Sequence, residues 1–63
     1  MQHLRVGSVV TLKWIEISTS TTVTGATVSN ITNSYIEVEY PSPDTTVRVV
    51  PWDHVGSLVV TQD

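Results

Sequence analysis

The sequence predicts an all-β fold, and three observations support this prediction. First, β-branched residues dominate the chain, with twelve valines, ten threonines and four isoleucines among 63 residues, and such side chains fit pleated, half-buried strands. Second, several segments alternate apolar and polar residues with the period of two that is typical of a strand with one buried face. Third, no apolar spacing of three and four residues persists over three turns, so we expect no long helix.

The first predicted strand covers residues 9–15. In it Val10, Leu12 and Trp14 share one face and alternate with polar residues. The segment EISTSTT at residues 16–22 then breaks the alternation with small polar side chains. We therefore predict a connecting loop after the first strand.

The second and third strands are predicted at residues 23–31 and 35–40, with a short polar turn of sequence TNS between them. Gly25 lies inside the second strand, where a glycine often marks a bulge or a bend. The third strand, YIEVEY, has the clearest alternation in the chain, because Ile36 and Val38 point one way with Tyr40. The opposite face of this strand carries Tyr35, Glu37 and Glu39.

The fourth strand is predicted at residues 46–50, after the turn-forming segment PSPDT. Pro51 lacks an N–H group and is expected to end this strand. The segment PWDH at residues 51–54 is too short for an α-helix but suits one 3₁₀ turn that begins with proline. The last strand is predicted at residues 57–61.

The phase of each strand predicts which side chains form the core. Residues that share a face with clear apolar neighbours are expected to be buried, because successive side chains of a strand point to opposite faces. The predicted core consists of Val10, Leu12, Trp14, Val28, Ile36, Val38, Val47, Val49, Val55, Leu58 and Val60.

This arrangement resembles the SH3-like small β-barrel superfamily over about residues 6–61. The stretch VVPWDHVGSLVV is similar to the way in which SH3 folds end, with a strand, a proline, one tight turn and a final strand. The resemblance implies a five-stranded SH3-like barrel with a 3₁₀ turn before the last strand. Peptide-binding SH3 domains hold proline-rich ligands with an aromatic loop after the first strand. The segment EISTSTT has no aromatic residue, so the resemblance does not imply proline recognition here.

The chain is also similar in outline to the type II plasmid dihydrofolate reductases, which are SH3-like tetramers. The similarity lies in the glycine placement and in the segment VRVVPWDHV. The catalytic Val-Gln-Ile-Tyr stretch of that family would fall on Val47 to Val50, which read Val-Arg-Val-Val in this chain. Because the glutamine and the tyrosine are missing, an oligomeric reductase-like enzyme is the least favoured hypothesis.

The length of the chain predicts one domain, residues 1–63, in which residues 1–6 either are disordered or extend an edge of the sheet. A chain this short buries only about 60% of the surface that its unfolded form exposes, so its core is marginal. There are no cysteines to form disulfides. Small scaffolds without disulfides or metals often gain stability by oligomerisation. We therefore expect a homo-oligomer, most simply a twofold dimer, in preference to a monomer.

The charge of the chain argues against nucleic acid as a partner. The net charge is −3, and the three cations, Arg5, Lys13 and Arg48, are spread along the sequence. Nucleic-acid binders usually concentrate cations in a patch. Because these cations are dispersed, a nucleic-acid-binding barrel is the alternative and not the main hypothesis. No run approaches the ~20 apolar residues of a membrane helix, and no secretory signal is visible. We expect a cytoplasmic protein that binds no membrane.

No group of residues predicts catalysis, a metal site or a cofactor. Asp53 and His54 are adjacent and Ser57 follows, but chain neighbours rarely adopt the spatial order of a nucleophilic triad. Glu37 and Glu39 are spaced like paired acids on one strand, yet this spacing is also that of a solvated strand face. We therefore expect a protein that is not an enzyme, with no metal and no cofactor.

The main functional hypothesis is a non-catalytic protein–protein interaction or self-assembly module. In style it resembles the compact SH3-like domains that phages and mobile elements encode. Aromatic residues and arginine dominate binding hot spots. Trp52 is predicted either to cap the end of the barrel or to anchor a partner. The predicted partner-binding residues are Trp52, Tyr35, Glu37, Glu39 and Arg48.

Overall fold

The structure, a computed structural model, describes residues 3–63. Its elements are β1 (Val9–Glu16), β2 (Thr19–Ile31), β3 (Tyr35–Glu39), β4 (Val47–Pro51), the 3₁₀ helix η1 (Trp52–His54) and β5 (Val55–Gln62). The all-β prediction is confirmed, and a 3₁₀ turn precedes the last strand as predicted. Within the described residues, no helix has the length and apolar character needed to cross a membrane.

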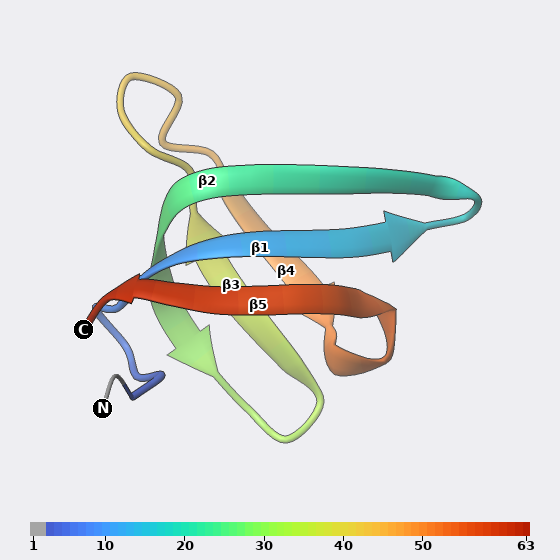
Figure 1. Cartoon of the computed structure of the whole chain (residues 1–63), viewed down its shortest axis with the longest axis horizontal. Helices are drawn as coiled ribbons and strands as arrows, with labels where there is room; N and C mark the ends of the chain where they lie inside the picture. The colour runs from blue at the N-terminus through green and yellow to red at the C-terminus, as the bar shows by residue number, and fades with distance from the viewer. Residues whose placement is uncertain (1–2) are drawn as a thin grey trace.

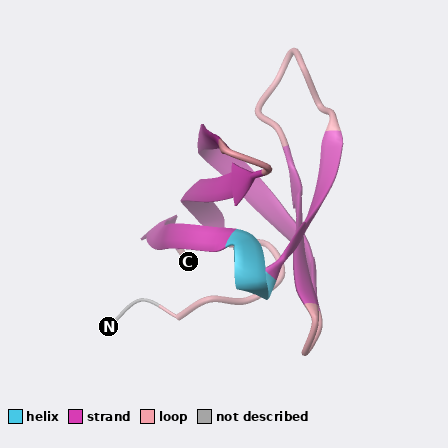
Figure 2. Cartoon of the chain, turned by 90° about the vertical axis from the view of Figure 1, so that its right-hand side faces the viewer, coloured by secondary structure: helices cyan, strands magenta, loops and turns pink. Residues whose placement is uncertain are grey.

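The five strands form one antiparallel sheet in the order β4-β3-β2-β1-β5. The long strand β2 curves so that its first half runs beside β1 and its second half runs beside β3 (Figure 1). The sheet therefore folds over itself, and the side view shows its strands running in two different directions (Figure 2). Strands β4 and β5 are the two edges and do not pair with each other, so the sheet is not closed.

Gly25 produces the bulge at the bend of β2. Its φ angle is 78°, in the left-handed region that favours glycine. Thr24 pairs with Thr11, whereas Ala26 pairs with Val10, so Gly25 is an extra residue between two neighbouring pairs. A bulge of this kind increases the local twist of a strand. The sequence prediction for Gly25 is confirmed.

The predicted loop at residues 16–22 is wrong. Strands β1 and β2 continue into this region and pair up to Glu16 and Thr19, which leaves only Ile17 and Ser18 as the turn. Threonine has high strand propensity, and the threonines of this segment extend β2 toward the turn. Ile17 has a φ angle of 61° and is 99% exposed.

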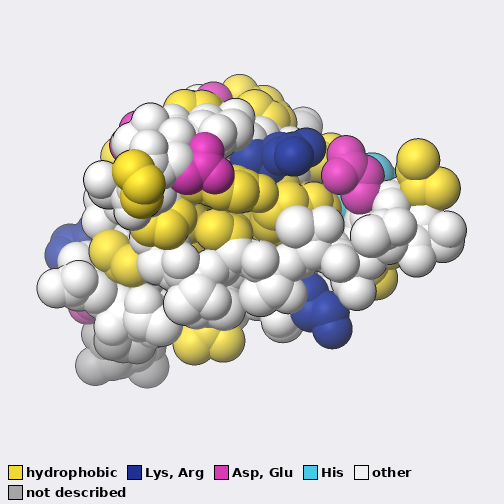
Figure 3. All heavy atoms as spheres, turned by 90° about the horizontal axis from the view of Figure 1, so that it is seen from above, with side chains coloured by type: hydrophobic (Ala, Val, Ile, Leu, Met, Phe, Trp, Pro, Cys, Tyr) yellow, Lys and Arg dark blue, Asp and Glu magenta, His cyan; other side chains and the backbone are white. Residues whose placement is uncertain are grey.

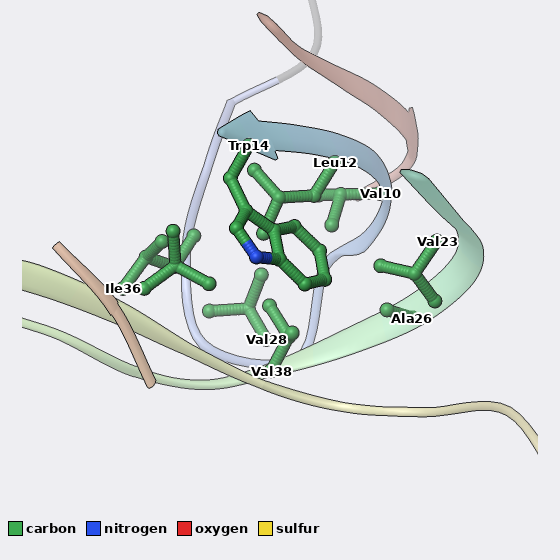
Figure 4. Packing of buried hydrophobic residues seen from close by; sticks show 9 residues of the cluster. Val10, Leu12, Trp14, Val23, Ala26, Val28, Ile36 and Val38 are labelled. Carbon is green, nitrogen blue, oxygen red and sulfur yellow. The ribbon is translucent and has the colours of Figure 1, made fainter. Parts of the chain in front are cut away.

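The core lies on the concave face of the sheet, with the Trp14 ring at its centre (Figure 4). Six predicted core residues are confirmed as buried: Val10, Leu12, Trp14, Val28, Ile36 and Val38. Val55, Leu58 and Val60 are only partly buried against this cluster. The core also contains three residues that the sequence analysis did not assign to it, Val23, Ala26 and Val50.

The predicted facing of β4 is wrong. Val47 and Val49 were expected in the core, but they are 53% and 48% exposed. The reason is the register between β3 and β4, in which Ile36 lies opposite Val50 and Val38 lies opposite Arg48. Directly opposite residues share a face of the sheet. The core side of β4 is therefore formed by Val50 and Arg48.

Residues 3–8 approach the second half of β2. The backbone N–H of Gly7 donates to the carbonyl of Val28 at 2.8 Å, and the N–H of Val28 donates to the carbonyl of Ser8 at 2.9 Å. Leu4 packs against the core, and Ser8 is fully buried. Of the segment 1–6, whose order was left open by the sequence, residues 1 and 2 lie outside the described residues.

Candidate functional site

The outward side of β3 and β4 brings together most of the predicted partner-binding residues. On β3, Tyr35 and Glu37 are partly buried and Glu39 is exposed. Opposite them on β4 lie Pro51, Val49 and Val47 respectively, and the five residue pairs between these strands run without a register shift. We call this surface the β3–β4 outer face; it consists of Tyr35, Glu37, Glu39, Val47, Val49 and Pro51.

The free edge of β4 adjoins this face. The N–H of Tyr40 donates to the carbonyl of Thr46 at 2.7 Å, and the N–H of Trp52 donates to the carbonyl of Ser34 at 3.1 Å. Thr46 and Trp52 therefore direct backbone groups toward β3. In an antiparallel ladder these directions alternate along a strand, so Val47, Val49 and Pro51 direct theirs away from β3. The edge thus presents amide donors at Val47 and Val49, while Pro51 presents a carbonyl but no N–H group.

Glu37 is held in place by the neighbouring strand. The Ser29 hydroxyl lies 2.7 Å from Glu37 Oε2 and 3.2 Å from the Glu37 carbonyl oxygen. Ser29 is the extra residue at the register shift between β2 and β3. Glu39 lies opposite Thr27 on one side and Val47 on the other. The two glutamates therefore form an acidic row behind the valines of β4, in which Glu37 is held by Ser29 and Glu39 is exposed.

Trp52 connects η1 to the turn between β2 and β3. Its indole N–H donates to the carbonyl of Thr32 at 2.7 Å, and its ring is partly buried against the core. The Thr32 hydroxyl in turn accepts from the backbone N–H groups of Ser34 and Tyr35, at 3.1 and 3.0 Å. These contacts fit a cap at the end of the sheet better than an exposed anchor for a partner, because the indole N–H already donates to Thr32 within the chain.

Arg48 does not join the β3–β4 outer face. Its guanidinium carbon lies 5.8 Å from the ring centroid of Trp14, and Nη1 lies 3.7 Å from Glu16 Oε2. Glu16 of β1 is thus the acidic partner of Arg48, and this predicted partner-binding residue lies apart from Glu37 and Glu39 of β3. A view from above shows a basic side chain lying over hydrophobic atoms, with an acidic side chain nearby (Figure 3).

Asp53, His54 and Ser57 are all exposed, the first two in η1 and the third in β5. Ser57 lies opposite Lys13. Across residues 3–63, no three histidine or acidic side chains are grouped as metal ligands, and no pocket is present.

The sequence analysis placed Val47 and Val49 in the core and so missed that both are exposed on an edge strand. One signal could have revealed it. Pro51 is the last residue of β4, and proline within a sheet is confined to edge strands, to the first residue of a strand or to bulges. A proline beside VRVV therefore indicates a strand with one unpaired side.

Comparison of this chain with protein-family models, with curated proteins and with solved structures finds no match.

Proposed function

We propose that this chain is a non-catalytic protein–protein interaction or self-assembly module, built as an open relative of the SH3-like small barrel. Five antiparallel strands, a second strand that bends at a glycine, and a 3₁₀ turn before the last strand support the relation to that fold. The proposed binding surface is the β3–β4 outer face together with the free edge of β4.

The observation that carries this proposal is the exposure of two valines on an unpaired strand. Val47 and Val49 are about half exposed, and their amides point away from the sheet. An extended segment of another chain can add to such an edge, where the backbone supplies hydrogen bonds and the side chains supply selectivity. Tyr35 extends the apolar surface at one end, and Glu37 and Glu39 form its polar border. Arg48 lies on the other side of β4 and is not part of the proposed surface.

Affinity capture with three baits tests the proposal. The baits are the wild-type chain, Val49→Lys, and Val59→Lys as a matched control, because Val59 is an exposed valine on the other edge strand. We expect wild type and Val59→Lys to retain the same protein partner, or an untagged copy of the chain, and Val49→Lys to lose it. A lysine on an edge strand opposes strand addition. Equal retention by all three folded baits, or loss from Val59→Lys alone, would contradict the proposal.

Heparin chromatography tests the nucleic-acid alternative. Arg48 is paired with Glu16, and Lys13 and Arg5 lie on other parts of the chain. Phosphate binding needs several cations acting together. We expect the chain to elute without retention at low salt, whereas retention that falls steeply as salt is added would favour a nucleic-acid-binding module.

A further inference from the structure

The two edges of the sheet differ in regularity. Strand β5 carries two bulges against β1, because Thr61 and Gly56 are extra residues between neighbouring pairs. Bulges interrupt the even spacing of backbone groups and twist an edge away from other chains. Strand β4 has no register shift against β3. Of the two edges, β4 is therefore the one that presents evenly spaced backbone groups to an incoming strand.

We propose that the partner of this edge is a second copy of the chain, paired antiparallel through β4 about a twofold axis at Val49. This inference rests on the proposed function and names its partner. In this arrangement Val49 lies opposite Val49 of the second copy, and Val47 lies opposite Pro51 of the second copy. The central valines exchange two hydrogen bonds, and each Val47 N–H donates one to a Pro51 carbonyl, which gives four bonds in all. The missing N–H of proline removes a donor from each outer pair but leaves its carbonyl free to accept.

The neighbouring registers are less favourable. An axis at Arg48 would place two guanidinium groups directly opposite each other, and like charges in that position destabilise a strand pair. An axis at Val47 would pair Val49 with Thr45, which lies outside β4 and has a φ angle of 50°. An axis at Val50 would bring Val47 against Asp53 in η1. Only the axis at Val49 keeps all contacts within β4 and sets Arg48 opposite Val50 on the core side.

Charge and area determine how strong the proposed dimer should be. Each chain has a net charge of −3, but Glu37 lies on β3, one strand behind the edge. The two Glu37 rows would be separated by three strand spacings, about 14 Å, which exceeds the Debye length of about 8 Å at physiological salt. The side chains that meet at the contact between the two β4 strands are the half-exposed valines, Val47 and Val49. A five-residue strand buries far less than the ~1,200 Å² of a standard stable interface, so the dimer should be weak and should form more readily as salt is added.

Cysteine cross-linking tests the register, because the chain contains no cysteine. Facing residues of a hydrogen-bonded pair have Cα atoms about 5.5 Å apart, within the range of a disulfide. Under mild oxidation we expect Val49→Cys to form a covalent dimer. Val47→Cys would lie four residues out of register, about 13 Å along the strand, and should not cross-link; neither should Arg48→Cys nor the control Val59→Cys. A cross-link at Val47 or Arg48 in place of Val49 would overturn the register.

Sedimentation velocity tests the dimer itself, over about 10 μM to about 1 mM chain. We expect the wild type and Val59→Lys to pass from 6.9 kDa toward twice that mass as concentration rises, and Val49→Lys to need at least about tenfold more protein for the same dimer fraction. Should Val49→Lys fail to fold, the cysteine series decides. A wild type that stays at 6.9 kDa at every concentration overturns the second copy as partner. If this monomer still captures a different protein and Val49→Lys does not, the proposed function stands without the dimer. A dimer that is equally strong in Val49→Lys overturns the β4 interface.

Discussion

The two tryptophans occupy contrasting environments. Trp14 belongs to the middle of β1, is only 2% exposed and is surrounded by aliphatic side chains from three other strands (Figure 4). Trp52 lies in η1, is partly buried, and hydrogen-bonds through its indole N–H to Thr32, twenty residues earlier in the chain. The same side chain therefore has two uses in this protein. Trp14 fills volume, whereas Trp52 connects two turns that are distant in sequence.

This contrast shows how a small open sheet is stabilised without disulfides. One large ring supplies much of the apolar volume between the two halves of the sheet. The other ring holds the end of the sheet where β4 passes into β5, because it ties η1 to the β2–β3 turn. The Arg48 guanidinium from β4 lies over the Trp14 ring, with 5.8 Å between its central carbon and the ring centroid.

Removal of the Trp14 ring should have the largest effect. Trp14→Ala leaves a cavity at the centre of the core, and substitutions of this type cost roughly 3–5 kcal/mol. A domain of this size has only a few kcal/mol of stability in total. We expect the variant to lack a cooperative thermal transition by far-UV circular dichroism. A variant that melts like the wild type would show that the ring does not lie in the core.

Changes at Trp52 should have an intermediate effect that separates packing from hydrogen bonding. Trp52→Phe keeps an aromatic ring but leaves the Thr32 carbonyl without its donor, at a cost of about 1 kcal/mol. Trp52→Ala also removes the packing and should cost about 2–4 kcal/mol. Chemical denaturation measures both, and amide shifts of Thr32 to Tyr35 should change in each variant. If Trp52→Ala melts at the wild-type temperature yet loses a bound partner, Trp52 is a binding anchor and not a cap.

Removal of the Arg48 charge should have the smallest effect. Arg48→Met retains an apolar stem over Trp14 and removes both the contact of the cation with the ring and the ion pair with Glu16. Exposed cation–π contacts and surface ion pairs each contribute up to about 1 kcal/mol. We expect a loss below about 1 kcal/mol that becomes smaller at high salt, with Lys13→Met as a control on the outer face of β1. A loss above about 2 kcal/mol would mean that Arg48 is essential for covering the core.

The sequence predicts the buried faces of β1 and β3 correctly because the alternation in these two strands is strict. It predicts the wrong facing for β4 because VRVV offers two phases, one with Val47 and Val49 inside and one with Arg48 and Val50 inside. Hydropathy favours the first phase. The second phase is adopted, and in it the Arg48 guanidinium has two partners, the ring of Trp14 beneath it and the carboxylate of Glu16 beside it. That compensation depends on a strand more than thirty residues away.

The turn between β1 and β2 was unpredictable for a different reason. Two-residue hairpin turns are usually marked by glycine, asparagine or aspartate at positions of positive φ. Here Ile17 takes such a position, with a φ angle of 61°. A β-branched residue in this conformation is a rare exception, so local sequence rules indicate a longer loop. For the candidate surface, Tyr35, Glu37 and Glu39 followed from alternation alone, whereas the contribution of Val47 and Val49 required the register of β4.

The bulges at Gly56 and Thr61 have a consequence for the size of any assembly. A sheet with two regular edges is bivalent, and copies that add at both ends can grow into a filament. This sheet has one regular edge and one interrupted edge, so the strand addition that we propose would be monovalent. Once two β4 strands meet, no equivalent edge is left on the outside, so growth by this route stops at a pair.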